Sequence, residues 1–119
     1  MNTRQSGSEG EDFVCAYIQE QGMKILQRNY RFGREEIDII AKDRDVLVFI
    51  EVKARLSAAK GLPEEAVTRQ KQRSIIFAAK GYLKQNNLFS SRMRFDVAAV
   101  LGKEIKYIKA AFDATGRSW

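Results

Sequence analysis

The stretch that decides the fold is residues 36–53, EIDIIAKDRDVLVFIEVK. It opens with Glu36–Ala41, a run rich in β-branched residues, and continues after a charged turn into the almost continuously apolar run Val46–Lys53. β-Branched residues favour strands, and a strand that is apolar on both sides is typical of the middle of a sheet whose two faces are covered. The stretch therefore predicts two strands that form a hairpin in an α/β sheet.

Turns and caps on either side predict the rest of the fold. Ser8 begins a Ser-x-x-Glu pattern, which indicates the start of a helix, and Pro63 sits at a favoured first helical position. The elements expected around the hairpin are a helix over residues 8–22, a strand over 24–30, a helix over 63–85 and strands over 94–101 and 104–109. The expected fold class is α/β, a single-domain sandwich with a central mixed sheet flanked by helices and an ordered core over about residues 7–112.

The composition is typical of a globular protein that stays out of membranes. The chain has 119 residues, of which 45% are hydrophobic and 30% charged, and no apolar run approaches the roughly 20 residues that a bilayer requires. The N-terminal residues lack the apolar core of a secretory signal, and the single cysteine, Cys15, cannot form an internal disulfide. We therefore expect a cytoplasmic protein.

The sequence has no histidine, which excludes several kinds of active site. Ser-His and Cys-His catalytic pairs and zinc sites built on imidazole all need that ring. Hydrolysis by this chain would have to use carboxylates, lysine or a hard metal ion. The 21 Lys and Arg against 15 Asp and Glu give a net charge of +6, which favours polyanionic partners such as nucleic acid.

Four ionisable side chains are expected to meet at the open end of the central hairpin. With the turn centred on residues 44–45, Asp38 faces Glu51 and Glu36 faces Lys53. Because side chains alternate along a strand, all four lie on one side of the sheet. The side chains expected on the opposite side are Ile37, Ile39, Ile50 and Val52.

This arrangement suits a divalent cation and the cleavage of a phosphodiester. Opposite β-carbons lie roughly 4.5–5.5 Å apart, so the carboxylates of Asp38 and Glu51 can converge on one Mg²⁺. Lys53 could hold or activate the attacking water, or offset negative charge that develops on a phosphate. The alternative is a set of ordinary cross-strand pairs, although several ionisable groups on a buried strand are costly without a function or an ion.

A series of short motifs runs in order along nearly the whole chain. The motifs are Gly10-Glu11, Ile25-Leu26-x-Arg28-Asn29, Glu36-Ile37-Asp38-x-Ile40-Ala41, Phe49-x-Glu51-Val52-Lys53-x-Arg55, Gly61-x-Pro63-x-x-Ala66-Val67, Lys71 and Arg94-Phe95-Asp96-Val97. The series resembles the YraN-like family, which is assigned to the restriction-endonuclease-like PD-(D/E)xK nucleases and is similar to archaeal Holliday junction resolvases. The resemblance implies a restriction-endonuclease-like fold.

The resemblance also implies roles for individual residues. Asp38 and Glu51 would be ligands of Mg²⁺ or Mn²⁺, Lys53 would be the catalytic lysine, and Glu11 would be the glutamate of the first helix that completes the metal site. From the residues alone, Glu11 could instead close the capping box that Ser8 opens.

Two neighbouring glutamates have less direct expected roles. We expect Glu36 to neutralise Lys53 across the hairpin, or to orient a water molecule beside the metal. Glu35 stands where the YraN-like family usually has glycine, so this chain departs from the family pattern at the rim of the site. The extra carboxylate could repel DNA or alter the turn.

Basic residues near the predicted site are candidates for contacts with phosphates. Lys71 falls on the apolar stripe of its helix, where its ammonium group either extends to the rim or contacts a phosphate. Arg55, on the same face as Lys53, either contacts the cleaved strand or is solvated at the strand end. Further candidates are Arg28, Arg31, Arg34 and Arg69, together with Arg73, Arg92 and Arg94, for which a solvated surface is the alternative.

The sequence therefore predicts a Mg²⁺- or Mn²⁺-dependent endonuclease that acts on DNA. No base-reading motif is evident, so DNA shape and backbone contacts would supply any selectivity. The resemblance to resolvases implies branched or structured DNA as substrate and a homodimer that makes two cuts. The alternative function is a non-cleaving nucleic-acid-binding or adaptor protein that keeps the nuclease scaffold.

Overall fold

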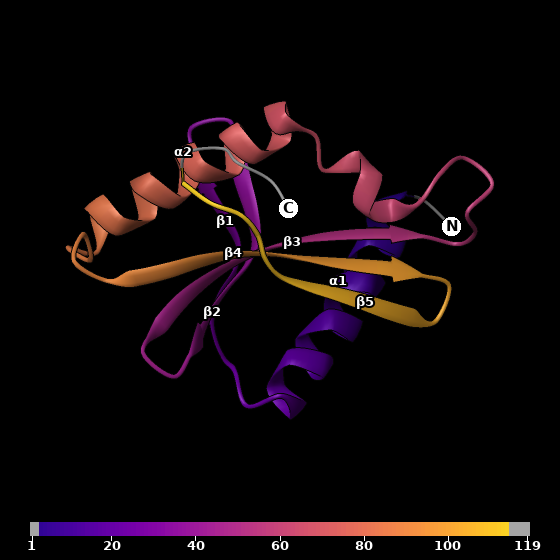
Figure 1. The fold of residues 1–119 in the computed structure, drawn as a ribbon, viewed down its shortest axis with the longest axis horizontal. Helices are drawn as coiled ribbons and strands as arrows, with labels where there is room; N and C mark the ends of the chain where they lie inside the picture. Colours follow the sequence, from indigo (N-terminus) through magenta and orange to yellow (C-terminus); the bar gives the residue numbers. More distant parts are fainter. Residues whose placement is uncertain (1–2, 115–119) are drawn as a thin grey trace.

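The computed structural model describes the backbone of residues 3–114 and the side chains of residues 9–114 (Figure 1). Its elements follow the order that the sequence predicts. Their bounds are α1 (Thr3–Glu20), β1 (Lys24–Phe32), β2 (Glu35–Asp43), β3 (Val46–Arg55), the 3₁₀ turn η1 (Pro63–Ala66), α2 (Arg69–Gln85), β4 (Arg92–Leu101) and β5 (Glu104–Phe112). No helix in this part of the chain is long and apolar enough to cross a membrane.

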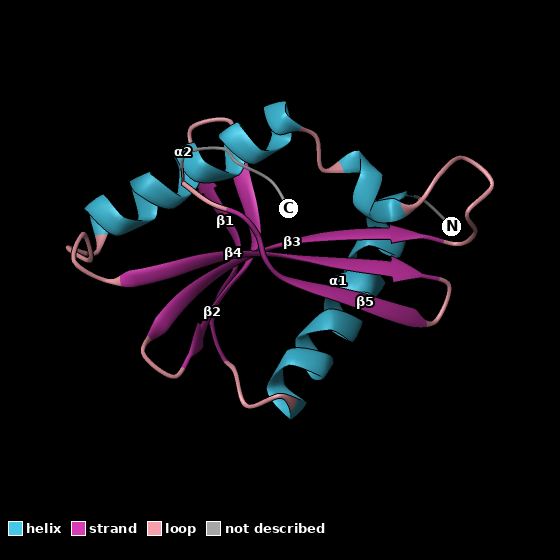
Figure 2. Ribbon diagram, in the orientation of Figure 1, coloured by secondary structure: helices cyan, strands magenta, loops and turns pink. Residues whose placement is uncertain are grey.

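The five strands form one mixed sheet in the order β1-β2-β3-β4-β5. β3 and β4 run parallel, and the other neighbouring strands run antiparallel. Parallel neighbours need a crossover connection, and the segment that contains η1 and α2 provides it. α1 and α2 lie on opposite faces of the sheet (Figure 2). The expected α/β sandwich with a mixed sheet, the architecture of a restriction-endonuclease-like domain, is confirmed.

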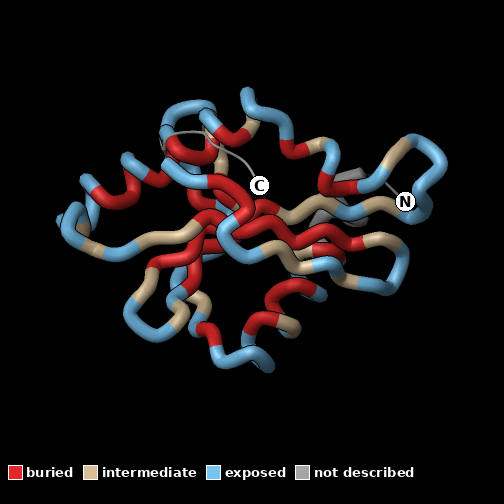
Figure 3. Tube along the Cα trace, in the orientation of Figure 1, coloured by how far each residue is buried: buried red, intermediate tan, exposed pale blue. Residues whose placement is uncertain are grey.

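The central strand β3 is buried on both faces, as its apolar sequence predicts (Figure 3). Val48 and Ile50 belong to the apolar cluster on the α1 face, whereas Phe49 belongs to the cluster on the α2 face. Burying each such side chain contributes about 1.5–3 kcal/mol relative to leaving it exposed. The apolar clusters on the two faces hold β3 at the centre of the molecule, and its last residues are less buried.

The first helix begins earlier than its capping pattern predicts. α1 already includes Thr3, so Ser8 lies within the helix and does not begin it; the side chain of Ser8 is outside the described residues. A Ser-x-x-Glu pattern fits the interior of a helix as well as its start, which is why it misplaces the boundary. The expected end is correct, because Gly22 has φ 93° and Met23 N–H donates to Ile18 C=O at 3.0 Å, as in a Schellman motif.

The helix expected over residues 63–85 is interrupted. η1 ends at Ala66, Val67 adopts a non-helical conformation (φ −89°, ψ 75°), and α2 begins after Thr68. Thr68 Oγ1 accepts a hydrogen bond from Lys71 N–H at 3.2 Å, so this threonine caps the new helix. The β-branched pair Val67-Thr68, with a threonine side chain that can cap, suits the start of a helix better than its interior. The prediction of one continuous helix is therefore wrong.

Candidate functional site

The sheet forks between β2 and β3, and the candidate site lies in the fork. The two strands pair from Asp43↔Val46 to Ile39↔Ile50, which is the predicted register, and the pairing ends there. Beyond this point β2 continues beside β1, and β3 continues beside β4 as far as Arg55. The ends of β3 and β4 and the start of β5 accordingly extend together, away from the β1–β2 hairpin (Figure 1).

Asp38 occupies the point where the two strands separate. The N–H of Val52 donates to Asp38 Oδ2 at 2.8 Å, so a side chain replaces the backbone acceptor that a continued ladder would have supplied. A carboxylate that accepts from a backbone N–H is held in a fixed orientation by a charge-assisted hydrogen bond. Asp38 is thereby held next to Glu51, the residue before Val52.

Glu51 is a buried acid in surroundings that disfavour its charge. Its side chain is 4% exposed, and Oε2 has no hydrogen-bond partner among the described residues. Burial, followed by the negative charge of Asp38 and a hydrogen bond with that residue, raises the pKa of Glu51 to about 9. Glu51 is therefore protonated at neutral pH unless a cation compensates its charge.

Two lysines lie on the side of β3 that carries Glu51. Lys71 Nζ, from the first turns of α2, is 3.7 Å from Glu51 Oε2, which is an ion-pair distance but too long for a hydrogen bond. Lys53 is half-buried on the same face of β3 and makes no ion pair with any described residue. The positive charges of both lysines lower the pKa of Glu51. Lys71 therefore has a third role beyond the two that the sequence offered, since it contacts a carboxylate of the protein.

Glu36 does not face Lys53, and this part of the predicted geometry is wrong. Glu36 instead forms an ion pair with Arg31 at 3.2 Å and accepts a hydrogen bond from Asn29 Nδ2 at 3.1 Å, both on β1. The cause is the fork. The β2–β3 pairing stops at Ile39, three residues short of Glu36, so Glu36 is not brought opposite Lys53.

The faces of β2 also switch at the fork. Ile39 packs in the cluster on the α1 face, as expected, but Ile37 packs in the cluster on the α2 face. Across β1 from Asp38, between the pairs Arg28↔Ile39 and Tyr30↔Ile37, Asn29 has φ 53°. A residue in this left-handed conformation breaks the regular alternation of a strand, and asparagine tolerates it better than most residues.

Glu11 approaches the site from α1. Its carboxylate accepts a hydrogen bond from Asn29 Nδ2 at 3.0 Å and lies 3.5 Å from the Arg28 guanidinium. Burial and the charge of Asp38 raise its pKa. The capping role is excluded, because α1 begins at Thr3 and Glu11 is well inside the helix. Asn29 joins Glu11 to Glu36, a connection that sequence reasoning missed although Asn29 belongs to one of the motifs.

The donor set suits a hard divalent cation that is only partly enclosed by protein. The described residues contain no group of three acidic, cysteine or histidine side chains arranged to hold a metal. Magnesium, however, is often bound through one or two carboxylates, with waters and substrate phosphates as the other ligands. Glu51 Oε2, which accepts no hydrogen bond from a described residue and lies beside Asp38, fits such a site, whereas Glu11 is engaged by Arg28 and Asn29.

The other basic candidates divide into internally bonded and exposed side chains. Arg28 pairs with Asp12 at 2.8 Å, and Arg55 Nη1 donates to the carbonyls of Lys60 and Gly61, which fixes the loop after β3. Arg94 is bonded to Asp96 and Asp43. The candidates that remain exposed and make no ion pair with described residues are Arg34, Arg69 and Arg73.

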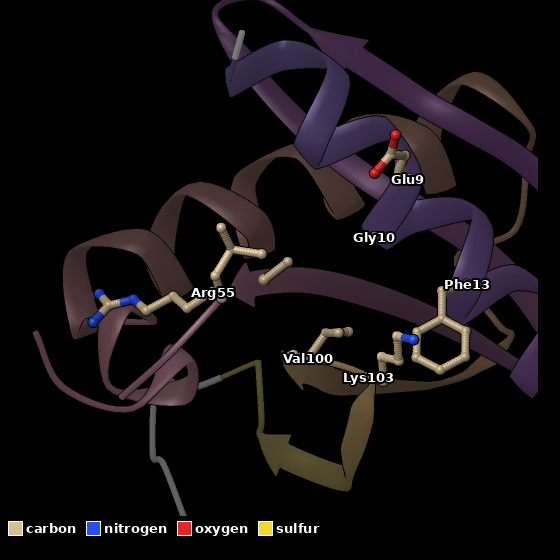
Figure 4. A pocket seen from close by; sticks show the side chains of 9 residues that line it. Glu9, Gly10, Phe13, Arg55, Val100 and Lys103 are labelled. Atoms are coloured by element: carbon tan, nitrogen blue, oxygen red, sulfur yellow. The ribbon is translucent and has the colours of Figure 1, made fainter. Parts of the chain in front are cut away.

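A pocket of about 460 Å³ lies beside the end of β3 (Figure 4). Its lining residues are Glu9, Gly10, Phe13, Ala54, Arg55, Leu56, Val100, Gly102 and Lys103. The walls are mainly apolar, and Asp38, Glu51 and Lys53 are not among them. This pocket is therefore separate from the carboxylates of the fork.

Comparison with known proteins identifies the family. Residues 10–100 match the family described as uncharacterised protein family UPF0102. The chain is 50% identical over 117 residues to a UPF0102 protein of Lachnoclostridium phytofermentans, a match that covers 98% of this chain and 99% of the relative. A UPF0102 protein of Chlorobaculum parvum is 51% identical over 116 residues, covering 89% of this chain and 90% of the relative.

A third relative is less similar over a comparable length. The UPF0102 protein of Syntrophotalea carbinolica is 43% identical over 114 residues, covering 92% of this chain and 93% of the relative. The family match spans Asp38, Glu51 and Lys53 together with most of the motifs that the sequence shows. The chain therefore belongs to the UPF0102 family, the YraN-like family that its motifs resemble.

Proposed function

We propose that this protein is a divalent-metal-dependent endonuclease that hydrolyses phosphodiester bonds in DNA, with branched or structured DNA as the substrate. The observation that carries the proposal is Glu51, a buried acid whose Oε2 accepts no hydrogen bond from a described residue, next to Asp38 and close to the positive charges of two lysines. Charged groups are costly to bury, and groups whose pKa is strongly shifted are concentrated at functional sites.

Each residue of the fork has a definite task in this proposal. Asp38 and Glu51 would hold Mg²⁺ or Mn²⁺, with Glu11 near enough to Asp38 for their charges to interact. When bound, the ion supplies Lewis-acid stabilisation of the negative charge that develops on the phosphate. The hydrogen bond from Val52 N–H keeps the Asp38 carboxylate oriented before the ion arrives, which lowers the cost of organising the site.

Lys53 and Lys71 would act on the substrate and on the site, respectively. Lys53 has no acidic partner within ion-pair distance among the described residues, so its ammonium group is free to orient a water or to contact the scissile phosphate. A fixed positive charge at the reacting phosphate stabilises the transition state more than the ground state. Lys71 is paired with Glu51 and is a positioning residue.

The experiment that tests the proposal compares cleavage of labelled linear, nicked and four-way DNA in Mg²⁺, Mn²⁺ and EDTA. The wild type should cut at least one substrate only when a divalent ion is present. Lys53→Ala should lose at least about a hundredfold in cleavage rate, and Lys42→Ala, which removes an exposed lysine from β2, should cleave like the wild type. Metal-independent cutting, or equal rates in the two variants, would contradict the proposal.

A second candidate function is a non-cleaving nucleic-acid-binding or adaptor protein. It is favoured by Lys71, whose ammonium group lies 3.7 Å from Glu51 Oε2 and gives the buried acid a partner that belongs to the protein, and by the lack of a three-ligand metal group among the described residues. Binding of all three DNAs without cutting in either metal ion would favour this second function.

A further inference from the structure

The outward face of α2 carries four cations in one stripe. They are Arg69, Arg73, Lys80 and Lys84, all exposed. With 3.6 residues per turn, these positions fall within roughly 60° of arc and span about 22 Å along the helix axis. We call them the basic stripe.

Nothing in the described chain neutralises the basic stripe. α2 contains no Asp or Glu, and none of the four side chains is within ion-pair distance of a described acidic residue. Other cations of the protein are paired internally, as Arg94 is with Asp43 and Asp96. A row of unpaired cations on an otherwise amphipathic helix is costly to maintain by self-repulsion and favours a polyanionic partner.

The basic stripe begins where α2 touches the fork. Arg69 and Arg73 are in the same turns of the helix as Lys71, whose ammonium group points inward to Glu51 at 3.7 Å. A long anion lying along the outer side of α2 would therefore cross the N-terminal turns of the helix about one helix diameter, roughly 10–12 Å, from the inner side on which Lys71 contacts Glu51. Phosphate contacts fix the register and orientation of a nucleic acid on a protein, so contacts at this end of the basic stripe would set where the anion lies relative to the fork.

The β1–β2 hairpin extends this surface. The ring of Phe32 packs against Phe77 with centroids 5.4 Å apart, and it covers Gly81 so closely that an added Cβ there would lie 2.4 Å from the ring. This contact fixes the hairpin tip beside the middle of α2. Arg34, at that tip, is exposed and makes no ion pair with a described residue.

We propose that the basic stripe binds the sugar–phosphate backbone of double-stranded DNA and directs the duplex to the fork. This inference rests on the proposed function, since it specifies how the substrate of the same site is held. Single-strand binders combine a charged groove with several aromatic platforms for the bases. The only exposed aromatic side chain between the cations of the basic stripe is Phe77, whose ring is already in contact with Phe32, so a row of cations facing backbone phosphates fits a duplex better.

The test measures binding of a labelled linear DNA duplex in EDTA as a function of salt, which separates binding from cleavage. The stripe variant is Arg73→Gln/Lys80→Gln/Lys84→Gln. The matched control is Lys24→Gln/Lys42→Gln/Lys109→Gln, which removes the same three charges from exposed strand positions. Each lost phosphate contact reduces the slope of log K against log salt by about 0.9.

The stripe variant should therefore show a slope smaller in magnitude by about 2–3, with at least a tenfold loss of affinity near 0.1 M salt. The control should keep the wild-type slope. The conservative variant Lys80→Arg/Lys84→Arg should bind like the wild type, because the charges are retained. Equal slopes for the stripe variant and the control would overturn the inference, since only net charge would then matter.

Two further comparisons test other polyanions as partners and distinguish failure of this inference from failure of the proposed function. Loss of binding confined to an RNA duplex or to phosphatidylglycerol vesicles would overturn the inference in favour of that partner. If the wild type binds DNA through the basic stripe and never cleaves it, the proposed function is wrong and the inference about the stripe is supported. If the wild type cleaves DNA and the stripe variant binds it normally, the inference about the stripe is wrong and the proposed function is supported.

Discussion

The hydroxyl of Tyr107 donates to the carboxylate of Asp96 at 2.6 Å, which joins the edge strand β5 to a fully buried side chain of β4. The same carboxylate accepts from the Arg94 guanidinium at 2.8 and 2.9 Å and from the N–H of Ala110 at 2.9 Å. Ala110 has φ 51°, and the β4–β5 register shifts beside Asp96. Asp96 thus holds an irregular part of the sheet together, although it belongs to a motif of the family.

Asp96→Ala should lower the free energy of unfolding by about 3–5 kcal/mol, because it strands a partly buried cation and a hydroxyl. Tyr107→Phe should cost about 1–2 kcal/mol, since it removes one hydrogen bond to a charged group. Urea unfolding followed by circular dichroism measures both. Arg92→Ala breaks an exposed pair with Asp45 and should change stability by about 0.5 kcal/mol or less. A loss for Asp96→Ala no larger than for this control would contradict the structural role.

Glu51→Gln should make the protein more stable in EDTA at neutral and alkaline pH. The pKa of Glu51 is raised from 4.5 to about 9, so between these values the folded state keeps a proton that the unfolded state has released. Wild-type stability therefore falls as pH rises, by up to about 1.4 kcal/mol per pH unit, until the pH passes the folded-state pKa. Urea unfolding between pH 5 and pH 9 measures the slope.

The pH dependence of the stability change caused by Glu51→Gln distinguishes the loss of a titrating group from a simple change in packing. Glutamine does not titrate, so the stability difference between Glu51→Gln and the wild type should be small at the acidic end and grow with pH. Parallel curves for the two proteins would show that Glu51 is not protonated in the folded state.

Mg²⁺ should raise the Tm of the wild type, because a ligand that binds only the folded state stabilises it by about 2.7 kcal/mol at a hundred times its Kd. Asp38→Asn and Glu51→Gln should lose this response. Lys53→Ala should keep it while losing cleavage, since Lys53 is assigned to the substrate. A Mg²⁺ response that survives in Asp38→Asn would place the ion elsewhere.

Gly81→Ala should lower the free energy of unfolding by about 1–3 kcal/mol, because the added methyl group overlaps the Phe32 ring at 2.4 Å. Combining it with Phe32→Leu should recover part of the loss, so that the double variant is more stable than additivity allows. Thermal or urea unfolding of the two single variants and the double variant measures this coupling. Strict additivity would mean that the hairpin tip does not rest on α2 at this glycine.

Much of the fold could be predicted because its signals are local. The apolar run Val46–Lys53 requires a strand covered on both faces, and the turn at residues 44–45 sets the register with β2 that the structure has. The end of α1 was also readable, since Gly22 adopts the left-handed conformation that glycine permits.

The geometry around the carboxylates could be predicted only in part. Asp38 and Glu51 are neighbours as expected, but the sequence extends the β2–β3 ladder past Ile39, where the structure ends it. The left-handed backbone of Asn29 and its two bonds to glutamates depend on the packing of α1 against β1. Contacts between segments far apart in the chain leave no periodic signal in either segment.

The parallel pairing of Val46 with Arg92 means that one edge of β3 is completed only by β4, which comes late in the chain. Until β4 arrives, one edge of the most apolar strand has unpaired N–H and C=O groups that other chains can join. Long-range strand pairing is slow compared with the closing of hairpins. A nascent or truncated chain that stops before Arg92 should therefore be the form most prone to aggregate, and the folding transition should be completed by the docking of β4.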